Sequence, residues 1–190
     1  MATATAEAGT SSIETSATPA RNWWWSAASD QAQDLGDLVL PDMPLYIGGV
    51  ETRDESWLNE KKITHIVDAS NFSFPRKEET VAGRKVLTVD VDDSPTVKID
   101  KYFGAVNKFI DEALDDNGVV LVHCMAGVSR SAALVLGFLI WKKNWTLKSA
   151  LQTVEKARPT INPNQAFRRQ LLDYEKKVLE LKGLNAPIPE

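Results

Sequence analysis

Cysteine and histidine are scarce in this sequence of 190 residues, which contains one cysteine, Cys124, and two histidines. A single cysteine cannot form an intramolecular disulfide, and a chain with a free thiol suits a reducing compartment. We therefore expect the protein in the cytoplasm or the nucleus. His65 and His123 belong to no recognisable cluster of metal ligands, so we predict neither a metal ion nor another cofactor.

The sequence also lacks an excess of positive charge and a long apolar run. Its formal net charge is -4, whereas the polyanionic surfaces of nucleic acids and membranes select basic proteins. We therefore expect no nucleic-acid partner, and any anion site must be local. The longest apolar run, residues 132–141, is about half of what a bilayer crossing needs, so it predicts a buried helix and no membrane insertion.

The composition divides the chain into an arm, a domain and a tail. Residues 1–40 show no helical or strand periodicity, so we expect a disordered or loosely docked arm. Within it, Trp23, Trp24 and Trp25 are expected to dock either on the domain itself or on a partner. An organelle transit peptide is the alternative, although the acidic residues and the lack of early arginines argue against it. Residues 41–183 form one domain, and 184–190 form a short tail.

Strand patterns alternate with helix patterns from residue 45 onward. We predict strands over residues 45–47, 63–69, 85–91 and 119–122, and helices over residues 52–61, 99–113 and 131–143. Two more helices follow, capped by Thr146 and Asn164, and residues 72–83 form a loop. This alternation favours an α/β fold in which helices flank a mostly parallel central sheet of about four to five strands.

The only cysteine lies between a predicted strand and a predicted helix, in the segment His123-Cys124-Met125-Ala126-Gly127-Val128-Ser129-Arg130-Ser131. A tight turn of this kind can direct the backbone N–H groups of residues 125–130 at one point, which creates a site for a tetrahedral oxyanion. Gly127 permits the sharp turn, and the Arg130 guanidinium can bind two phosphate oxygens. The same positive field stabilises a thiolate at Cys124, which predicts a nucleophile that attacks phosphorus.

A phosphate ester also needs a proton donor for its leaving group. Asp92 and Asp93 follow the strand predicted at 85–91, and in a parallel sheet that loop lies at the same edge as Cys124. We choose Asp93 as the general acid and base, with Asp92 as the alternative. The Ser131 hydroxyl is expected to hydrogen-bond the thiolate when it leaves in the second step.

The nucleophile segment resembles the active-site motif of the protein tyrosine phosphatase superfamily, and its Ala-Gly-x-Ser-Arg-Ser form resembles the dual-specificity phosphatases. Residues 44–48, 63–67, 93–95 and 158–167 resemble further segments of that family. The resemblance implies a protein tyrosine phosphatase-like fold, with 41–183 as a catalytic domain of the small, atypical type. It also implies that His123 orients the nucleophile loop and that Asn164 supports it.

The same resemblance implies phosphoprotein substrates. Val128 and Ser129 stand where phosphoinositide phosphatases of the superfamily usually carry Lys and Gly, which disfavours a highly anionic lipid head group. The chain lacks an obvious counterpart of the Asn-Arg-Tyr segment of tyrosine-only enzymes. A shallower site open to phosphoserine and phosphothreonine as well as phosphotyrosine is therefore expected.

The sequence leaves three questions open. Arg158 is expected either to contact a second phosphate or to interact with the dipole at a helix end. The whole chain is either an enzyme or a phosphoprotein-binding module that keeps the fold without turnover. As an enzyme, it acts either on phosphoproteins or on a non-protein phosphate such as RNA 5′-triphosphate, glucan or lipid.

Overall fold

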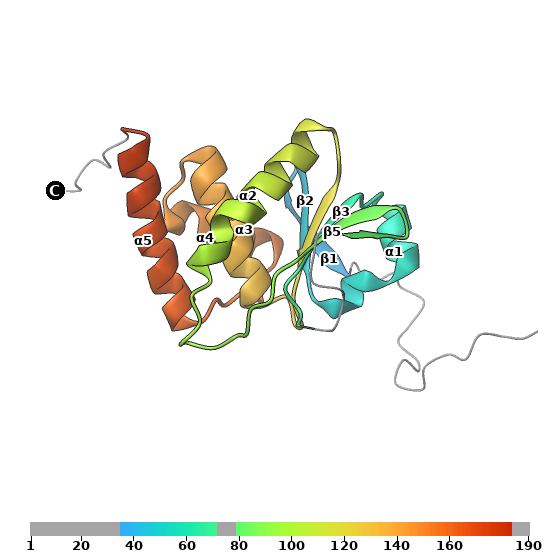
Figure 1. Ribbon diagram of the computed structural model, residues 1–190, viewed down its shortest axis with the longest axis horizontal. Helices are drawn as coiled ribbons and strands as arrows, with labels where there is room; N and C mark the ends of the chain where they lie inside the picture. Colours follow the sequence, from blue (N-terminus) through green and yellow to red (C-terminus); the bar gives the residue numbers. More distant parts are fainter. Residues whose placement is uncertain (1–34, 72–78, 184–190) are drawn as a thin grey trace, which may run out of the picture. The chain divides into compact units, whose positions relative to one another are not determined.

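The computed structural model describes residues 35–71 and 79–183, which fold around one central sheet (Figure 1). Its elements follow the chain in the order β1 Gly36–Leu40, β2 Met43–Gly48, the 3-10 helix η1 Val50–Arg53, α1 Glu55–Glu60, β3 His65–Asp68, β4 Glu79–Val81, β5 Arg84–Thr88, α2 Asp100–Asp115, β6 Val120–His123, α3 Arg130–Lys143, α4 Leu147–Ala157 and α5 Gln165–Leu181. The predicted strands at 45–47, 63–69, 85–91 and 119–122 are therefore all present.

The described strands form a six-stranded sheet in the order β1-β2-β6-β3-β5-β4. The four inner strands pair in parallel, whereas β1 and β4 add to the two edges in antiparallel orientation. The α/β class with a mostly parallel centre is confirmed. The expected four to five strands did not include the two edge strands.

Strand β1 also corrects the predicted boundary of the arm at residue 40. Residues 36–40 belong to the sheet, because Val39 is buried in the core and the backbone of β1 pairs with β2. The part of the predicted arm that contains Trp23, Trp24 and Trp25, and the predicted tail 184–190, lie outside the described residues. The docking of these tryptophans stays a prediction.

The inner strands alternate their side chains between two apolar clusters. Val120 and Val122 of β6 join the larger cluster with α2, α3, α4 and α5, whereas Leu121 joins the smaller cluster beside α1. Figure 1 shows α1 apart from the group of larger helices. A strand that is buried on both faces reads as a continuous apolar run, as residues 119–122 do.

Helix α3 lies at the centre of the larger cluster. Its residues from Arg130 to Ile140 are all buried, and it contacts β6 and β2 on one side and α2, α4 and α5 on the others. A helix that is apolar all round needs cover on every side. The prediction of a buried helix over 132–141 is confirmed, and among the described residues no helix is long and apolar enough to span a bilayer.

Two local predictions differ from the structure. The cap of α1 is Asp54, whose carboxylate accepts from the Trp57 N–H, whereas the Thr52 hydroxyl donates to the Gly49 carbonyl in the preceding 3-10 helix. The predicted loop 72–83 contains strand β4. The caps predicted at Thr146 and Asn164 are confirmed, since both side chains accept a backbone N–H of the first helical turn.

Candidate active site

The loop between β6 and α3 is held by contacts to its carbonyl groups. The Val50 N–H donates to the Met125 carbonyl at 3.0 Å, and the Asn162 N–H donates to the Val128 carbonyl at 2.8 Å. Arg158 supplies the donors to the two carbonyls between them, those of Ala126 and Gly127. Because these carbonyls are engaged by the surrounding protein, the loop N–H groups are left to face its centre.

The Cys124 thiol lies at that centre and is 2% exposed. Burial alone would raise the pKa of this thiol. Hydrogen bonds from the Ser131 hydroxyl and from the backbone N–H groups of Ser131, Gly127 and Val128 outweigh it and lower the pKa below its ordinary value. The Ser131 oxygen is 3.3 Å from the sulfur. These contacts favour the thiolate, which is the form of cysteine that acts as a nucleophile.

Arg130 begins helix α3 and is 8% exposed. One of its terminal nitrogens donates to the Val91 carbonyl at 3.4 Å, which fixes the guanidinium against the loop that follows β5. Its Nε is buried and has no hydrogen-bond partner among the described residues. A buried donor without an acceptor is unfavourable in a finished protein core, so this atom suits an anion that arrives from outside.

The two candidate acids differ in what they contact. The Asp93 Oδ1 accepts from the Ser129 hydroxyl at 2.7 Å and from the Asn164 side-chain amide at 2.8 Å. Asp92 instead accepts from the side-chain amide of Asn71, in the segment after β3. Asp93 is therefore tied to the loop that carries the thiol, and Asp92 is not. The geometry favours Asp93 over Asp92 for a role on the bound group.

Asn164 connects three parts of the site. Its backbone N–H donates to the Ser129 hydroxyl at 3.1 Å, and its side-chain amide donates to Asp93. Its side-chain oxygen accepts from the Phe167 N–H and so caps α5. The structure thus brings the predicted supporting residue to the nucleophile loop. The Ser129 side chain, which the sequence grouped with the phosphate-binding loop, bonds Asp93 instead.

Arg158 lies behind the loop. Its Nε donates to the Gly127 carbonyl at 3.0 Å, and its terminal nitrogens contact the Ala126 carbonyl and the carboxylates of Asp37 and Glu51. These contacts use donors on all three nitrogens. The structure therefore gives Arg158 a structural role that neither alternative anticipated: it braces the nucleophile loop against β1 and η1.

His123 precedes the thiol and is 1% exposed. Its Nδ1 lies 3.5 Å from the Cys124 carbonyl oxygen, and its Nε2 lies 3.6 Å from Asp68 Oδ1. Burial lowers the pKa of His123, although the nearby Asp68 charge opposes this effect. Sequence reasoning missed Asp68. Its position at the end of a strand next to β6 was the available signal, because neighbouring parallel strands end at one edge.

No group of three or more potential metal ligands occurs among residues 35–71 and 79–183. The site offers one thiol, one guanidinium, one acidic side chain and a ring of backbone N–H groups. This set suits covalent transfer of a tetrahedral anionic group.

Comparison with known proteins agrees with this chemistry. The family model described as dual specificity phosphatase, catalytic domain matches residues 45–177. Human dual specificity protein phosphatase 22 is 38% identical over 139 residues, which cover 73% of this chain and 72% of that protein. A probable dual specificity protein phosphatase of Dictyostelium discoideum is 39% identical over 130 residues, which cover 68% of this chain and 32% of that protein.

Solved structures give the same result. A mouse protein described as a dual specificity phosphatase and complexed with zinc tungstate has a TM-score of 0.73 and 29% identity, and the match covers 86% of this chain and 99% of that chain. Four of the curated relatives are much longer than the matched part. The chain spans about a third or less of their length.

Proposed function

The chain belongs to the dual specificity phosphatase family, and we propose on that basis that it hydrolyses phosphotyrosine, phosphoserine and phosphothreonine in proteins through a phosphocysteine intermediate. In this proposal Cys124 is the nucleophile, Arg130 binds the phosphoryl oxygens and Asp93 is the general acid and base. The backbone N–H groups of residues 125–130 complete the oxyanion site.

The first step transfers the phosphoryl group to sulfur. The Cys124 thiolate attacks phosphorus in line, so that an S–P bond forms as the P–O bond to the substrate side chain breaks. Asp93 gives its proton to the departing oxygen, which leaves as a neutral hydroxyl. The charge on the phosphoryl oxygens is stabilised by Arg130 and by the loop N–H groups.

The second step releases inorganic phosphate. Asp93, now ionised, accepts a proton from a water molecule that attacks phosphorus, and the S–P bond breaks. The sulfur leaves as a thiolate, which the Ser131 hydroxyl stabilises from 3.3 Å. The enzyme returns to its starting state, since the proton lost by Asp93 in the first step is regained in the second.

One observation supports this proposal most directly. The buried Arg130 Nε, which has no hydrogen-bond partner in the part of the chain that the structure describes, belongs to the residue that closes a loop whose N–H groups surround the Cys124 sulfur. A tetrahedral oxyanion satisfies that donor and the N–H groups together. The mouse protein was crystallised with zinc tungstate, and tungstate is likewise a tetrahedral oxyanion.

The test is hydrolysis by the purified chain. We expect wild-type protein to hydrolyse p-nitrophenyl phosphate and peptides with each of the three phosphoresidues. Cys124→Ser is expected to abolish turnover, and acid quenching of the wild type is expected to trap phosphate on sulfur. No turnover by the wild type at any pH from about 5 to 7 would refute the enzyme and leave a phosphoprotein-binding module.

The substrate class needs a separate comparison. The phosphopeptides are assayed beside an RNA 5′-triphosphate, a phosphorylated glucan and a phosphoinositide at equal concentration. We expect the highest kcat/KM on a phosphopeptide. A large preference for one of the other three would overturn the proposed substrate class while leaving the roles of Cys124 and Arg130 intact.

A further inference from the structure

The nucleophile loop passes the end of strand β2, which is the neighbour of the edge strand β1. In the sheet β2 lies between β1 and β6, and Asp37 of β1 pairs with Ile47 of β2. The Cys124 N–H donates to the carbonyl of Gly48, the last residue of β2, at 3.3 Å. Helix α4 contacts β1, and the C-cap residue of this helix is Arg158. The fold thus brings an edge-strand carboxylate and a helix-end guanidinium to the loop.

Arg158 binds two consecutive peptide groups of the loop. Its Nε donates to the Gly127 carbonyl at 3.0 Å, and one terminal nitrogen donates to the Ala126 carbonyl at 3.4 Å. A peptide group is planar and trans, so its C=O and its N–H point in opposite directions. Each carbonyl that is held toward Arg158 therefore directs the N–H of its own peptide group to the other side of the loop.

These two peptide groups carry N–H groups that face the nucleophile. The Ala126 carbonyl shares its peptide group with the Gly127 N–H, and the Gly127 carbonyl shares its group with the Val128 N–H. Both N–H groups donate to the Cys124 sulfur, and both bonds help to lower the pKa of the thiol. Arg158 therefore acts on the sulfur through two planar groups that it holds from the opposite side.

Carboxylates hold the Arg158 guanidinium in turn. Its second terminal nitrogen donates to Asp37 Oδ2 at 2.7 Å, whereas Glu51 Oε1 lies 3.6 Å from the nitrogen that binds the Ala126 carbonyl. The Glu51 carboxylate is shared, because it also accepts from the Gly49 backbone N–H at 3.1 Å. The Arg158 side chain is 15% exposed, so protein groups rather than water set its orientation. Asp37 makes the shorter of the two ionic contacts.

We propose that Asp37 is a positioning residue for the nucleophile, because it holds the Arg158 guanidinium in the orientation that directs two loop N–H groups at the Cys124 sulfur. Without this carboxylate the guanidinium loses its shortest contact, and its bonds to the two carbonyls weaken. Charge alone predicts the opposite result, since removal of a nearby negative charge lowers the pKa of a thiol. The sign of the change therefore separates positioning from charge.

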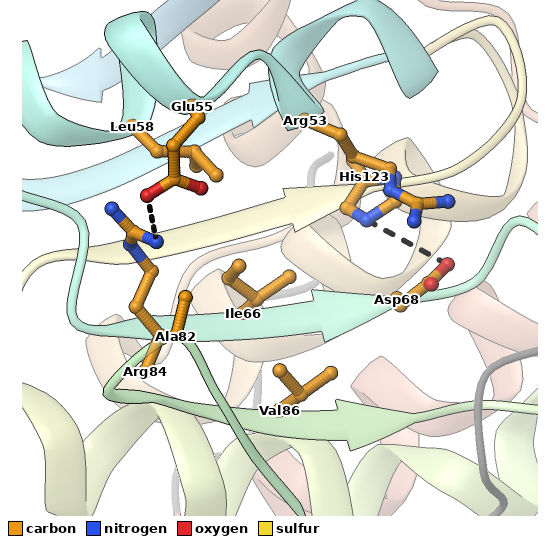
Figure 2. A pocket seen from close by; sticks show the side chains of 9 residues that line it. All are labelled: Arg53, Glu55, Leu58, Ile66, Asp68, Ala82, Arg84, Val86 and His123. Carbon is orange, nitrogen blue, oxygen red and sulfur yellow. Dashed lines mark hydrogen bonds and ion pairs between the residues drawn. The ribbon is translucent and has the colours of Figure 1, made fainter. Parts of the chain in front are cut away.

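A second arginine offers a matched control. Arg84 also donates from Nε to a backbone carbonyl, that of Ile63, at 3.0 Å. One of its terminal nitrogens donates to Glu55 of α1 at 2.8 Å, and Figure 2 shows this ion pair. Glu55→Gln and Asp37→Asn each replace a carboxylate that binds an arginine by an amide of the same shape. Only Asp37→Asn acts on an arginine that binds the nucleophile loop.

The test is alkylation of the full chain by iodoacetamide as a function of pH, which reports on its one cysteine. We expect Asp37→Asn to raise the pKa of Cys124 and to lower the ratio of thiolate to thiol roughly three- to tenfold, the size of one weakened hydrogen bond. Arg158→Lys keeps the charge but loses the planar fork, so it is expected to change this ratio in the same direction. Glu55→Gln is expected to leave it unchanged.

The other titratable side chains at the loop come from three elements. They are His123 from β6, Arg130 from α3 and Asp93 from the segment after β5. All three are retained in every variant, so a difference between variants is not a change in their number.

Two results would overturn the inference. One is an unchanged or lower pKa of Cys124 in a folded Asp37→Asn variant, with folding checked by thermal unfolding. The other is an equal rise in Glu55→Gln, which would indicate a general loosening of the fold. If Asp37→Asn does not fold, Arg158→Lys must raise the pKa of Cys124 by itself.

The consequence for catalysis rests on the proposed function. With p-nitrophenyl phosphate, kcat/KM is expected to fall roughly three- to tenfold in Asp37→Asn and to stay unchanged in Glu55→Gln. Alkylation requires no turnover. A wild-type chain without phosphatase activity would therefore refute the proposed function, while the alkylation result would still decide the role of Asp37.

Discussion

Replacing Ser131 by alanine is expected to raise the pKa of the Cys124 thiol. The Ser131 hydroxyl lies 3.3 Å from the sulfur and is the largest of the contacts that lower this pKa. The side chain is fully buried, so water cannot replace the lost donor without entering the core. Alanine has nearly the same size, and the backbone N–H at position 131 is retained.

The magnitude follows from the charge on the acceptor. A hydrogen bond to a charged group contributes about 1.5–3 kcal/mol. Since about 1.4 kcal/mol corresponds to a factor of ten in an equilibrium constant, Ser131→Ala is expected to raise the pKa of Cys124 and to lower the ratio of thiolate to thiol by roughly 10- to 100-fold. A thiolate is present above its pKa and is lost as the pH falls through it. The pH below which Cys124 loses its reactivity is therefore expected to be higher in Ser131→Ala than in the wild type.

The assay is the rate of inactivation by iodoacetamide as a function of pH, because this reagent reacts with the thiolate. The chain has one cysteine, so alkylation reports on Cys124 alone. Ser56→Ala, an exposed serine of α1, serves as a control for loss of a hydroxyl, and thermal unfolding checks that both variants fold. An unchanged or lower midpoint in folded Ser131→Ala would refute the assignment of Ser131 as the main stabilising contact.

Three further predictions concern the proposed acid and the loop. Asp93→Asn is expected to lower kcat about 100-fold for a phosphoserine peptide. The loss is expected to be smaller for p-nitrophenyl phosphate, because its leaving group needs no proton. Asp92→Asn is expected to leave kcat nearly unchanged for both substrates, and equal losses in the two variants would contradict the choice of Asp93. Gly127→Ala is expected to destabilise the fold by about 1–3 kcal/mol in urea unfolding and to abolish turnover, because φ is 65° and a Cβ would lie 2.5 Å from the backbone of Gly48. Arg158→Ala is expected to lower kcat/KM by the same factor for singly and doubly phosphorylated peptides, because the Arg158 donors bind the loop carbonyls. A selective loss on the doubly phosphorylated peptide would instead support the alternative that Arg158 contacts a second phosphate.

Much of the fold was predictable because local patterns and burial agree. The run 119–122 is apolar at every position and occupies the centre of the sheet, and residues 132–141 are apolar on all sides and form the central helix. The edge strands were not predictable in this way. β1 and β4 pair with the sheet on one side only, and the turn before β5 places Ala82 at φ 49° without the usual Asn-Gly or Asp-Gly pair.

The proposed nucleophile, the proposed phosphate-binding arginine and the two acid candidates could also be chosen from the sequence. A thiol, a glycine and an arginine at fixed spacing after a strand are typical of a phosphate-binding turn with a nucleophilic thiol. All three residues lie in one short segment, so the pattern can be recognised without the tertiary structure. The sequence could not choose between Asp92 and Asp93 by contact, because the choice depends on Ser129 and Asn164, which lie 36 and 71 positions from Asp93. Only the packing of α5 against the loop brings these groups together.

The proposed reacting groups and their order along the chain could be taken from the sequence alone, because the nucleophile loop is one continuous segment. What supports that segment became visible only in the folded chain. Arg158 reaches the loop carbonyls from the end of α4, and Asp68 reaches His123 across two parallel strands. Such contacts join residues far apart in the chain, so they exist only once the sheet has set the register of its strands.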